Sequence, residues 1–95
     1  MADEISFDWD QANVAHIRRH RVTPEEVEQM FRNNPREIDH DVIGGENRWT
    51  SVGHTDLLRV LVAVWTERGE TTRVITAYTA PRRPRLAYLK WKRLI

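Results

Sequence analysis

Alternating apolar and polar residues predict that the chain begins with a strand and continues into a helix. From Ile5 to Trp9 the side chains change between apolar and polar at every residue, which is typical of a half-buried strand at or near a sheet edge. Asp10 is a favourable N-cap for a helix that runs to about His20, with Val14 and Ile17 three residues apart on one side.

A second helix carries the clearest start signal in the chain. Thr23 can cap it, Pro24 fits its first position, and Glu26 stands where a capping box places an acid. Its apolar side lies within residues 27–31. The stretch from Asn33 to Pro35 ends the helix, because the residue before a proline disfavours helical backbone angles.

Four strand-like segments follow and are separated by turns. The predicted strands are Arg36 to Val42, Asn47 to about His54, Leu57 to Thr66 and Thr71 to Thr79. Gly44-Gly45 supplies the positive φ angles of a hairpin turn, and Glu67 to Glu70 closes a second hairpin. The third segment is apolar on both faces and therefore predicts a central, buried strand.

The chain is predicted to end in a helix. Pro81 and Pro84 interrupt the sheet, and Arg85 to Ile95 places Tyr88, Trp91 and its last residue along one side. The complete order is βααββββα, an α+β fold in which helices pack on a small antiparallel sheet. The length of 95 residues predicts a single domain over residues 1–95.

Composition excludes several classes of protein. The chain has no cysteine, so it has neither a disulfide framework nor a thiolate zinc site. Its longest apolar run, residues 57–65, is about half the roughly 20 residues that cross a bilayer. Residues 1–10 carry acids and no Lys or Arg, unlike a secretory signal. We therefore expect a cytoplasmic protein without membrane contact.

Charge is divided unevenly along the chain. Residues 1–70 contain 8 Lys and Arg against 14 Asp and Glu, a net charge of −6, whereas residues 71–95 contain 7 Lys and Arg and no acid, a net charge of +7. This asymmetry indicates a basic surface for phosphate or for an acidic partner. An ordinary solvated helix is the alternative explanation.

Metal and cofactor motifs are weak or missing. His16 and His20 lie four residues apart on a predicted helix, and His40 stands between Asp39 and Asp41, but no third ligand has a motif spacing. Such a histidine pair more often faces solvent. The chain also has no nucleophile elbow, phosphate-binding loop or dinucleotide fingerprint. We expect no metal and no cofactor.

A set of cationic and titratable side chains on the predicted strands deserves more weight. Arg48 and His54 have the same parity and share a face, while Arg73 and Tyr78 point to opposite faces, with Glu67 at the hairpin. These residues are therefore not all expected in one site.

Metal-free RNA cleavage needs a base for the ribose 2′-hydroxyl, a cation for the phosphate and an acid for the leaving oxygen. A histidine or Glu67 can serve as base or acid, and Arg73 or Arg48 can hold a phosphate through two hydrogen bonds. In the alternative interpretation the arginines extend from a half-solvated sheet face and pair with Glu67 or Glu70.

Several motifs together resemble a known family. They are Phe7 to Asp10, Asn13, Arg19 to Glu26, Glu46 to Arg48, Arg59 to Glu70, and Arg73 to Ala77. In this order and spacing they resemble the BrnT family of type II toxins over about nine-tenths of the chain. The F-x-W-D opening and the T-E-R-G hairpin are the most specific parts.

The resemblance implies a RelE/ParE-like fold and a ribonuclease that blocks translation. A ribbon-helix-helix antitoxin would neutralise it, and the complex would bind operator DNA through the antitoxin. The substrate would be RNA, either free or on the ribosome. On this reading Arg73 and Arg48 stabilise the phosphate, and protons are transferred by His20, Glu67 or Tyr78. The RNA-binding residues would be Arg82, Arg83 and Arg85.

The chain departs from the family pattern at two places. The family usually reads K-H-G-V where this chain has Arg19 to Val22, and S-A-R-K-A where it has Thr76 to Ala80. Tyr78 would then act as the acid or base in place of a lysine. Two other functions stay open: a catalytically inactive module of the toxin fold that pairs with an antitoxin, and a gyrase inhibitor like the ParE branch.

Overall fold

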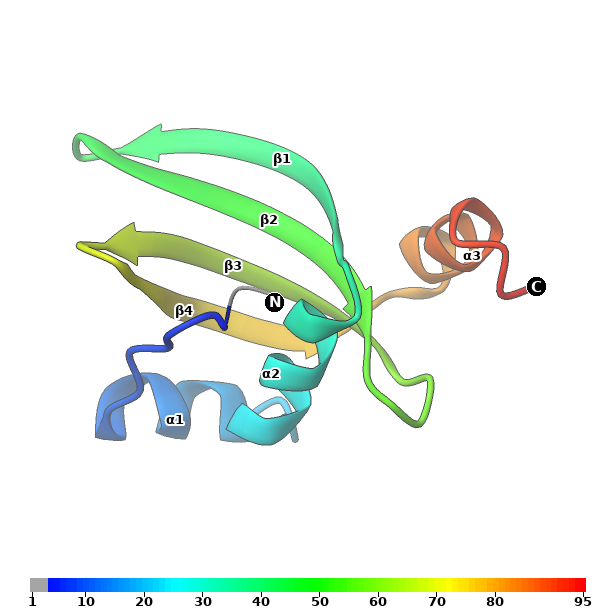
Figure 1. Cartoon of the computed structure of the whole chain (residues 1–95), viewed down its shortest axis with the longest axis horizontal. Helices are drawn as coiled ribbons and strands as arrows, with labels where there is room; N and C mark the ends of the chain where they lie inside the picture. Colours follow the sequence, from blue (N-terminus) through cyan, green and yellow to red (C-terminus); the bar gives the residue numbers. More distant parts are fainter. Residues whose placement is uncertain (1–3) are drawn as a thin grey trace.

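The computed structural model describes residues 4–95 and contains three helices and four strands (Figure 1). The elements are α1 (Gln11–Arg18), α2 (Pro24–Arg32), β1 (Arg36–Ile43), β2 (Glu46–His54), β3 (Val60–Arg68), β4 (Thr71–Thr79) and α3 (Arg82–Trp91). The sheet is antiparallel with the order β1-β2-β3-β4. This arrangement confirms the predicted α+β class and the helices packed on a small sheet.

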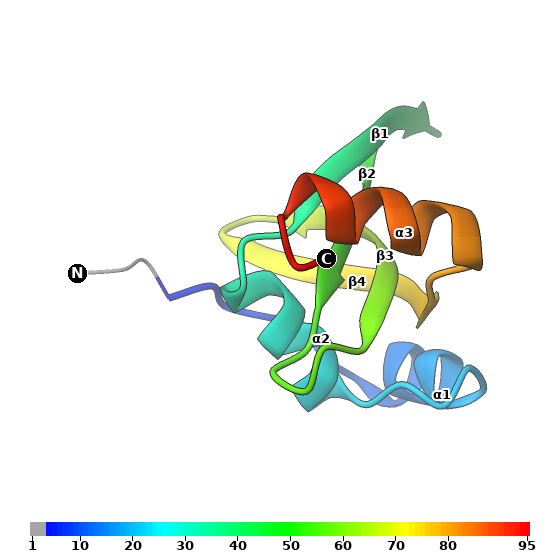
Figure 2. The ribbon, with the colours of Figure 1, turned by 90° about the vertical axis from the view of Figure 1, so that its right-hand side faces the viewer.

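The helices divide the sheet into two unequal faces (Figures 1 and 2). One face, which we call the helix face, packs Leu61, Ala63 and Trp65 of β3 against α1 and α2. The opposite face carries Val62 and meets α3 only near one end of the strands. We call this second face the open face.

Both helix starts follow the sequence signals. Asp10 caps α1 in a capping box with Asn13, and Thr23 caps α2 in a capping box with Glu26. Asn13 is also buried, where its amide donates to the carbonyls of Asp8 and Val74. The first cap therefore also ties α1 to the edge of β4.

The prediction that residues 5–9 form a strand is wrong. Phe7 forms only an isolated parallel bridge with Thr72 of β4, where the Asp8 N–H donates to the Thr72 carbonyl over 2.9 Å. The Thr72 N–H donates to the Ser6 carbonyl over 2.7 Å. Pairing stops there because Asp10 turns the chain into α1. The order is thus ααββββα. Residues 4–9, which we call the N-terminal segment, lie along the edge of β4.

The third predicted strand begins later than expected. Its first residues, Leu57 and Leu58, are 93% and 57% exposed, and Leu58 has a φ angle of +66°. The Leu58 N–H donates to the Thr55 carbonyl over 2.9 Å, which makes this stretch a turn. A left-handed residue cannot continue a strand. The strand therefore starts at Val60.

The last helix begins three residues before the predicted start and ends four residues before the predicted end. It starts at Arg82 and contains Pro84 in its first turn. A proline is tolerated there because the first N–H groups of a helix have no partner within it. Arg93 has a φ angle of +62°, which ends the helical path beyond Trp91. Within residues 4–95, no helix is long and apolar enough to cross a membrane.

A hydrogen bond between His54 and Tyr88 attaches α3 to the sheet. Nδ1 of His54 lies 2.7 Å from the Tyr88 hydroxyl. Burial raises the pKa of Tyr88, so the hydroxyl stays protonated. Burial and the nearby charge of Lys92 lower the pKa of His54, although Asp56 acts in the opposite direction. The contact therefore favours a neutral imidazole.

We expect acid to destabilise the protein partly through His54. The unfolded histidine has the higher pKa, so the unfolded chain binds the proton first as the pH falls below about 6.5. The stabilisation is complete above that value and is lost as the pH falls through the lower pKa of the folded state. Thermal unfolding of wild type and His54→Gln between about pH 7.5 and pH 5 should show a smaller pH dependence in the variant. Equal dependence in both proteins would contradict this assignment; His40→Gln, at an exposed site on β1, serves as the control.

Candidate functional site

A bulge in β4 decides which side chains share the open face. Val64 pairs with Thr76, but the next residue of β3, Trp65, pairs with Val74, so Ile75 is an extra residue in β4. Arg73 and Tyr78 pair with Thr66 and Val62, which have the same parity on β3. The two side chains therefore lie on the same face, and the predicted opposition between them is wrong.

Arg48 belongs to the same row as Arg73. Trp49 pairs with Trp65, which places Arg48 beside Thr66, and Thr66 pairs in turn with Arg73. The backbone pairing of β2 with β3 ends at Trp49, so Arg48 lies one residue beyond it, on the side of β3 opposite Arg73. Thr66 between them is buried and donates its hydroxyl proton to the Asn47 carbonyl over 2.6 Å.

Acids hold both arginines, but not the acids that the alternative interpretation predicted. Arg73 Nη1 lies 2.9 Å from Asp10 and 3.4 Å from Asp8. Arg48 Nε lies 3.3 Å from Glu46, which also pairs with Arg68. The predicted pairing with Glu67 or Glu70 is therefore wrong. Sequence reasoning missed Asp8 and Asp10 because their contact with Arg73 depends on the attachment of the N-terminal residues to β4. Glu46 lies two residues before Arg48 on the same strand, so strand alternation could have identified it.

The pairing of Arg73 changes the acidity of both partners. The hydrogen bond to Asp10 is the largest cause of the raised pKa of the Arg73 guanidinium, and it lowers the pKa of the Asp10 carboxyl. Asp8 adds a second negative charge. Arg73 therefore faces two carboxylates at the edge of β4, a group with a net charge of −1, and an anion must compete with both acids for the guanidinium.

Tyr78 and His20 form the second part of the site. Their ring centroids are 6.0 Å apart, although His20 follows α1 and Tyr78 lies near the end of β4. The ring centroids of His16 and His20 are 5.8 Å apart. A phenol and an imidazole in contact at a partly solvated position can take up and release protons at a bound substrate.

Three arginines lie four to seven residues after Tyr78 along the chain. Arg82, Arg83 and Arg85 are exposed in the first turns of α3, which begins next to the end of β4 (Figure 2). Within residues 4–95 none of the three forms an ion pair, and no side chain caps the helix at Pro81. Free guanidinium groups and a helix N-terminus both attract anions.

Glu67 is not brought to this site. It has the same parity as Trp65 and therefore lies on the helix face, beside a hollow of about 400 Å³ near the strand turns. His54, which shares the parity of Arg48, is covered by α3 through its bond to Tyr88. The residues that do share the open face or its border are Arg48, Arg73, Tyr78, His20, Arg82, Arg83 and Arg85, which we call the open-face site.

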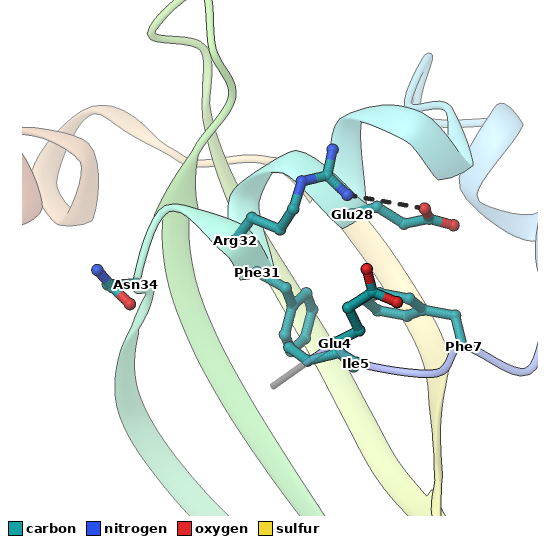
Figure 3. Close-up of a pocket in the computed structure, with 7 residues that line it drawn as sticks. All are labelled: Glu4, Ile5, Phe7, Glu28, Phe31, Arg32 and Asn34. Atoms are coloured by element: carbon teal, nitrogen blue, oxygen red, sulfur yellow. Dashed lines mark ion pairs between the residues drawn. The ribbon is translucent and has the colours of Figure 1, made fainter. Parts of the chain in front are cut away.

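A larger pocket lies elsewhere and contains none of these residues (Figure 3). It has a volume of about 780 Å³ and lies between the N-terminal segment and α2. Its lining residues are Glu4, Ile5, Phe7, Glu28, Phe31, Arg32 and Asn34. Among residues 4–95 no three His, Asp or Glu side chains gather in a way that could hold a metal ion.

Comparison with known proteins found one matching family. Residues 9–83 match the family described as "Ribonuclease toxin, BrnT, of type II toxin-antitoxin system". This match covers well over half of the chain and includes Tyr78 and the first arginines of α3. No curated protein sequence matches the chain.

Proposed function

Because the chain belongs to the BrnT family of ribonuclease toxins of type II toxin-antitoxin systems, we propose that it cleaves RNA at the open-face site, without a metal ion, and thereby inhibits translation. The observation that carries this proposal is the bulge at Ile75, which puts Arg73 and Tyr78 on one face. The contact between His20 and Tyr78 and the free arginines of α3 support it further.

The site has a phosphate-binding part and a proton-transfer part. Arg48 and Arg73 form the first, and Tyr78 with His20 forms the second, four β3 positions or roughly 13 Å farther along the sheet. An RNA strand would lie along the open face with the scissile phosphate between the two parts. Its neighbouring phosphates would reach the arginines of α3, whose charges increase affinity without reading base sequence.

The reaction is an attack of the ribose 2′-oxygen on the adjacent phosphorus. His20 removes the proton of the 2′-hydroxyl, a bond forms between this oxygen and phosphorus, and the bond from phosphorus to the 5′-oxygen breaks. The Tyr78 hydroxyl donates its proton to the leaving 5′-oxygen. Arg73 and Arg48 stabilise the negative charge that develops on the phosphoryl oxygens. The products are a 2′,3′-cyclic phosphate and a 5′-hydroxyl.

The partners follow from the same proposal. A type II toxin family implies an antitoxin and an RNA substrate. We assign a ribbon-helix-helix antitoxin, contact with operator DNA through that antitoxin, action on ribosome-bound RNA and a cytoplasmic location. The two helices on one face of the sheet and the single helix on the other support a RelE/ParE-like fold.

Induced expression in a bacterial host tests the proposal together with cleavage by the purified chain. We expect growth arrest, loss of protein synthesis and cut RNA, and cleavage of RNA by purified protein in the presence of a chelator. Cleavage that required an added metal ion would contradict the metal-free mechanism. Intact RNA with linearised plasmid would indicate gyrase inhibition instead, and normal growth with folded protein would indicate an inactive antitoxin-binding module.

A further inference from the structure

One edge of the sheet is covered by another segment of the chain, and the other edge is open. The N-terminal segment covers the edge of β4 through its hydrogen bonds to Thr72. At the other edge, β1 has all eight residues exposed, and no described helix or strand runs along its outer side (Figure 1). A strand of this length with an open edge can pair with another chain.

Two side chains show where the open hydrogen-bonding groups of β1 lie. The His40 N–H donates to the Asp39 carboxylate over 2.8 Å, and the Val42 N–H donates to the Asp41 carboxylate over 2.8 Å. These two N–H groups therefore point away from β2. The N–H and C=O of one strand residue point to the same side, so both carbonyls are also directed outward. An added strand would find two donors and two acceptors in register.

The side chains of β1 indicate what kind of strand would fit. Asp39 and Asp41 lie on the open face, because Asp41 pairs with Arg48, and within residues 4–95 neither forms an ion pair. On the helix face, Val42 is 57% exposed, and His40 stacks on Trp49 with ring centroids 5.4 Å apart. Within residues 39–42, one face of the edge is therefore acidic and the other is apolar and aromatic.

A second copy of this chain is a poor occupant. Antiparallel pairing of β1 with itself centred on His40 would place Asp39 opposite Asp41 of the other copy, and pairing centred on Asp41 would place the two Asp41 carboxylates opposite each other. Like charges directly opposite one another destabilise a sheet. The carboxylates therefore protect the edge against self-association, and a partner strand must bring positive charges that pair with them.

We propose that β1 binds an extended segment of a partner chain in which Lys or Arg alternates with apolar residues, so that the segment becomes a fifth strand of the sheet. Its cations pair with Asp39 and Asp41, and its apolar side chains pack beside His40 and Val42. The His40 and Val42 N–H groups exchange their carboxylate acceptors for carbonyls of the partner. Asp41 is the strand neighbour of Arg48 in the open-face site, but strand addition uses the outer edge of β1 and is measured by peptide binding rather than by RNA cleavage, so either proposal can fail alone.

The test uses the full chain and a short acetylated peptide of alternating lysine and valine. NMR titration should move the amide signals of β1 and slow hydrogen exchange of His40 and Val42. Asp39→Asn with Asp41→Asn should weaken binding about three- to tenfold, since two partly exposed ion pairs are lost. Val42→Pro, which removes one outward donor at an edge where proline is tolerated, should weaken it further.

A matched peptide separates strand addition from simple charge attraction. It has the same lysines but a proline in place of the central valine, and it should not bind. Equal binding of the two peptides would overturn the proposal, as would signal changes confined to another surface or undiminished binding to both variants. Dimerisation of the chain through β1 would also overturn it. Thermal unfolding of the Asp39→Asn and Asp41→Asn variant establishes that it is folded.

Discussion

Replacing Tyr78 with phenylalanine is expected to lower the rate of RNA cleavage by about 10²- to 10⁴-fold, the usual contribution of a general acid. The variant loses the hydroxyl that donates a proton to the leaving oxygen but keeps the ring that lies against His20 and packs near α3. Its stability should therefore stay within about 0.5 kcal/mol of wild type. Cleavage of a labelled RNA at saturating protein, together with thermal unfolding, measures both effects.

The chain contains a matched control for this substitution. Tyr88 is the only other tyrosine, and Tyr88→Phe removes a buried hydroxyl bound to His54 rather than one at the open-face site. It should lower stability and leave the cleavage rate nearly unchanged. His20→Gln should resemble Tyr78→Phe, and the double variant should be little worse than either, because the two residues act in one step. A Tyr78→Phe protein with the wild-type rate would show that another group supplies the proton.

Replacing Arg73 with alanine is expected to lower cleavage by about 10²- to 10³-fold, the effect of removing one donor to a developing negative charge. The guanidinium shares the open face with Tyr78 and is separated from Arg48 by strand β3. The substitution also breaks the ion pairs that hold the N-terminal segment to β4. Activity alone would therefore not separate phosphate binding from structural support.

A variant that lacks both carboxylates separates phosphate binding by Arg73 from its structural role. Asp8→Asn with Asp10→Asn removes both negative charges and keeps Arg73, and asparagine remains a good cap for α1. If Arg73 binds phosphate, this variant should cleave RNA at least as well as wild type, because a phosphate no longer competes with two carboxylates. A loss as large as that of Arg73→Ala would assign Arg73 to the attachment of the N-terminal segment instead.

Low pH should weaken the ion pair between Asp10 and Arg73. The pKa of Asp10 is lower in the folded chain, chiefly because Arg73 donates a hydrogen bond to it. The resulting stabilisation is present above the ordinary pKa of the carboxyl, 3.8, and is lost as the pH falls through the lower folded value. The loss at Asp10 begins near pH 3.8 and the loss at His54 begins near pH 6.5, so one pH series can follow the onset of each.

Local chemistry explains the elements that sequence reasoning placed correctly. The capping boxes at Asp10 and Thr23 fix the starts of α1 and α2 within a few residues of chain. Gly44 and Gly45 have φ angles of +59° and +79°, as the hairpin between β1 and β2 requires. The apolar run of β3 occupies the interior of the sheet, as its composition predicted. In each case the deciding contacts are close neighbours along the chain.

The errors arose where distant contacts override a local pattern. The alternation of residues 5–9 is compatible with a strand, but the cap of α1 and the attachment to Thr72 leave only a bridge. Leu57 and Leu58 are as apolar as strand residues, yet the turn from Thr55 exposes them. Pro84 resembles a break and instead occupies the first turn of α3. Periodicity does not carry these tertiary constraints.

The sequence by itself determined the α+β class, the helix caps, the hairpins, the basic C-terminal part and the resemblance to the toxin family, since each depends on residue type and short spacing. Only the tertiary structure decided the composition of the open-face site. One extra residue, Ile75, reverses the parity between Arg73 and Tyr78, and strand alternation puts Glu67 on the other face. A bulge depends on how two strands pair, which no pattern within one strand reveals.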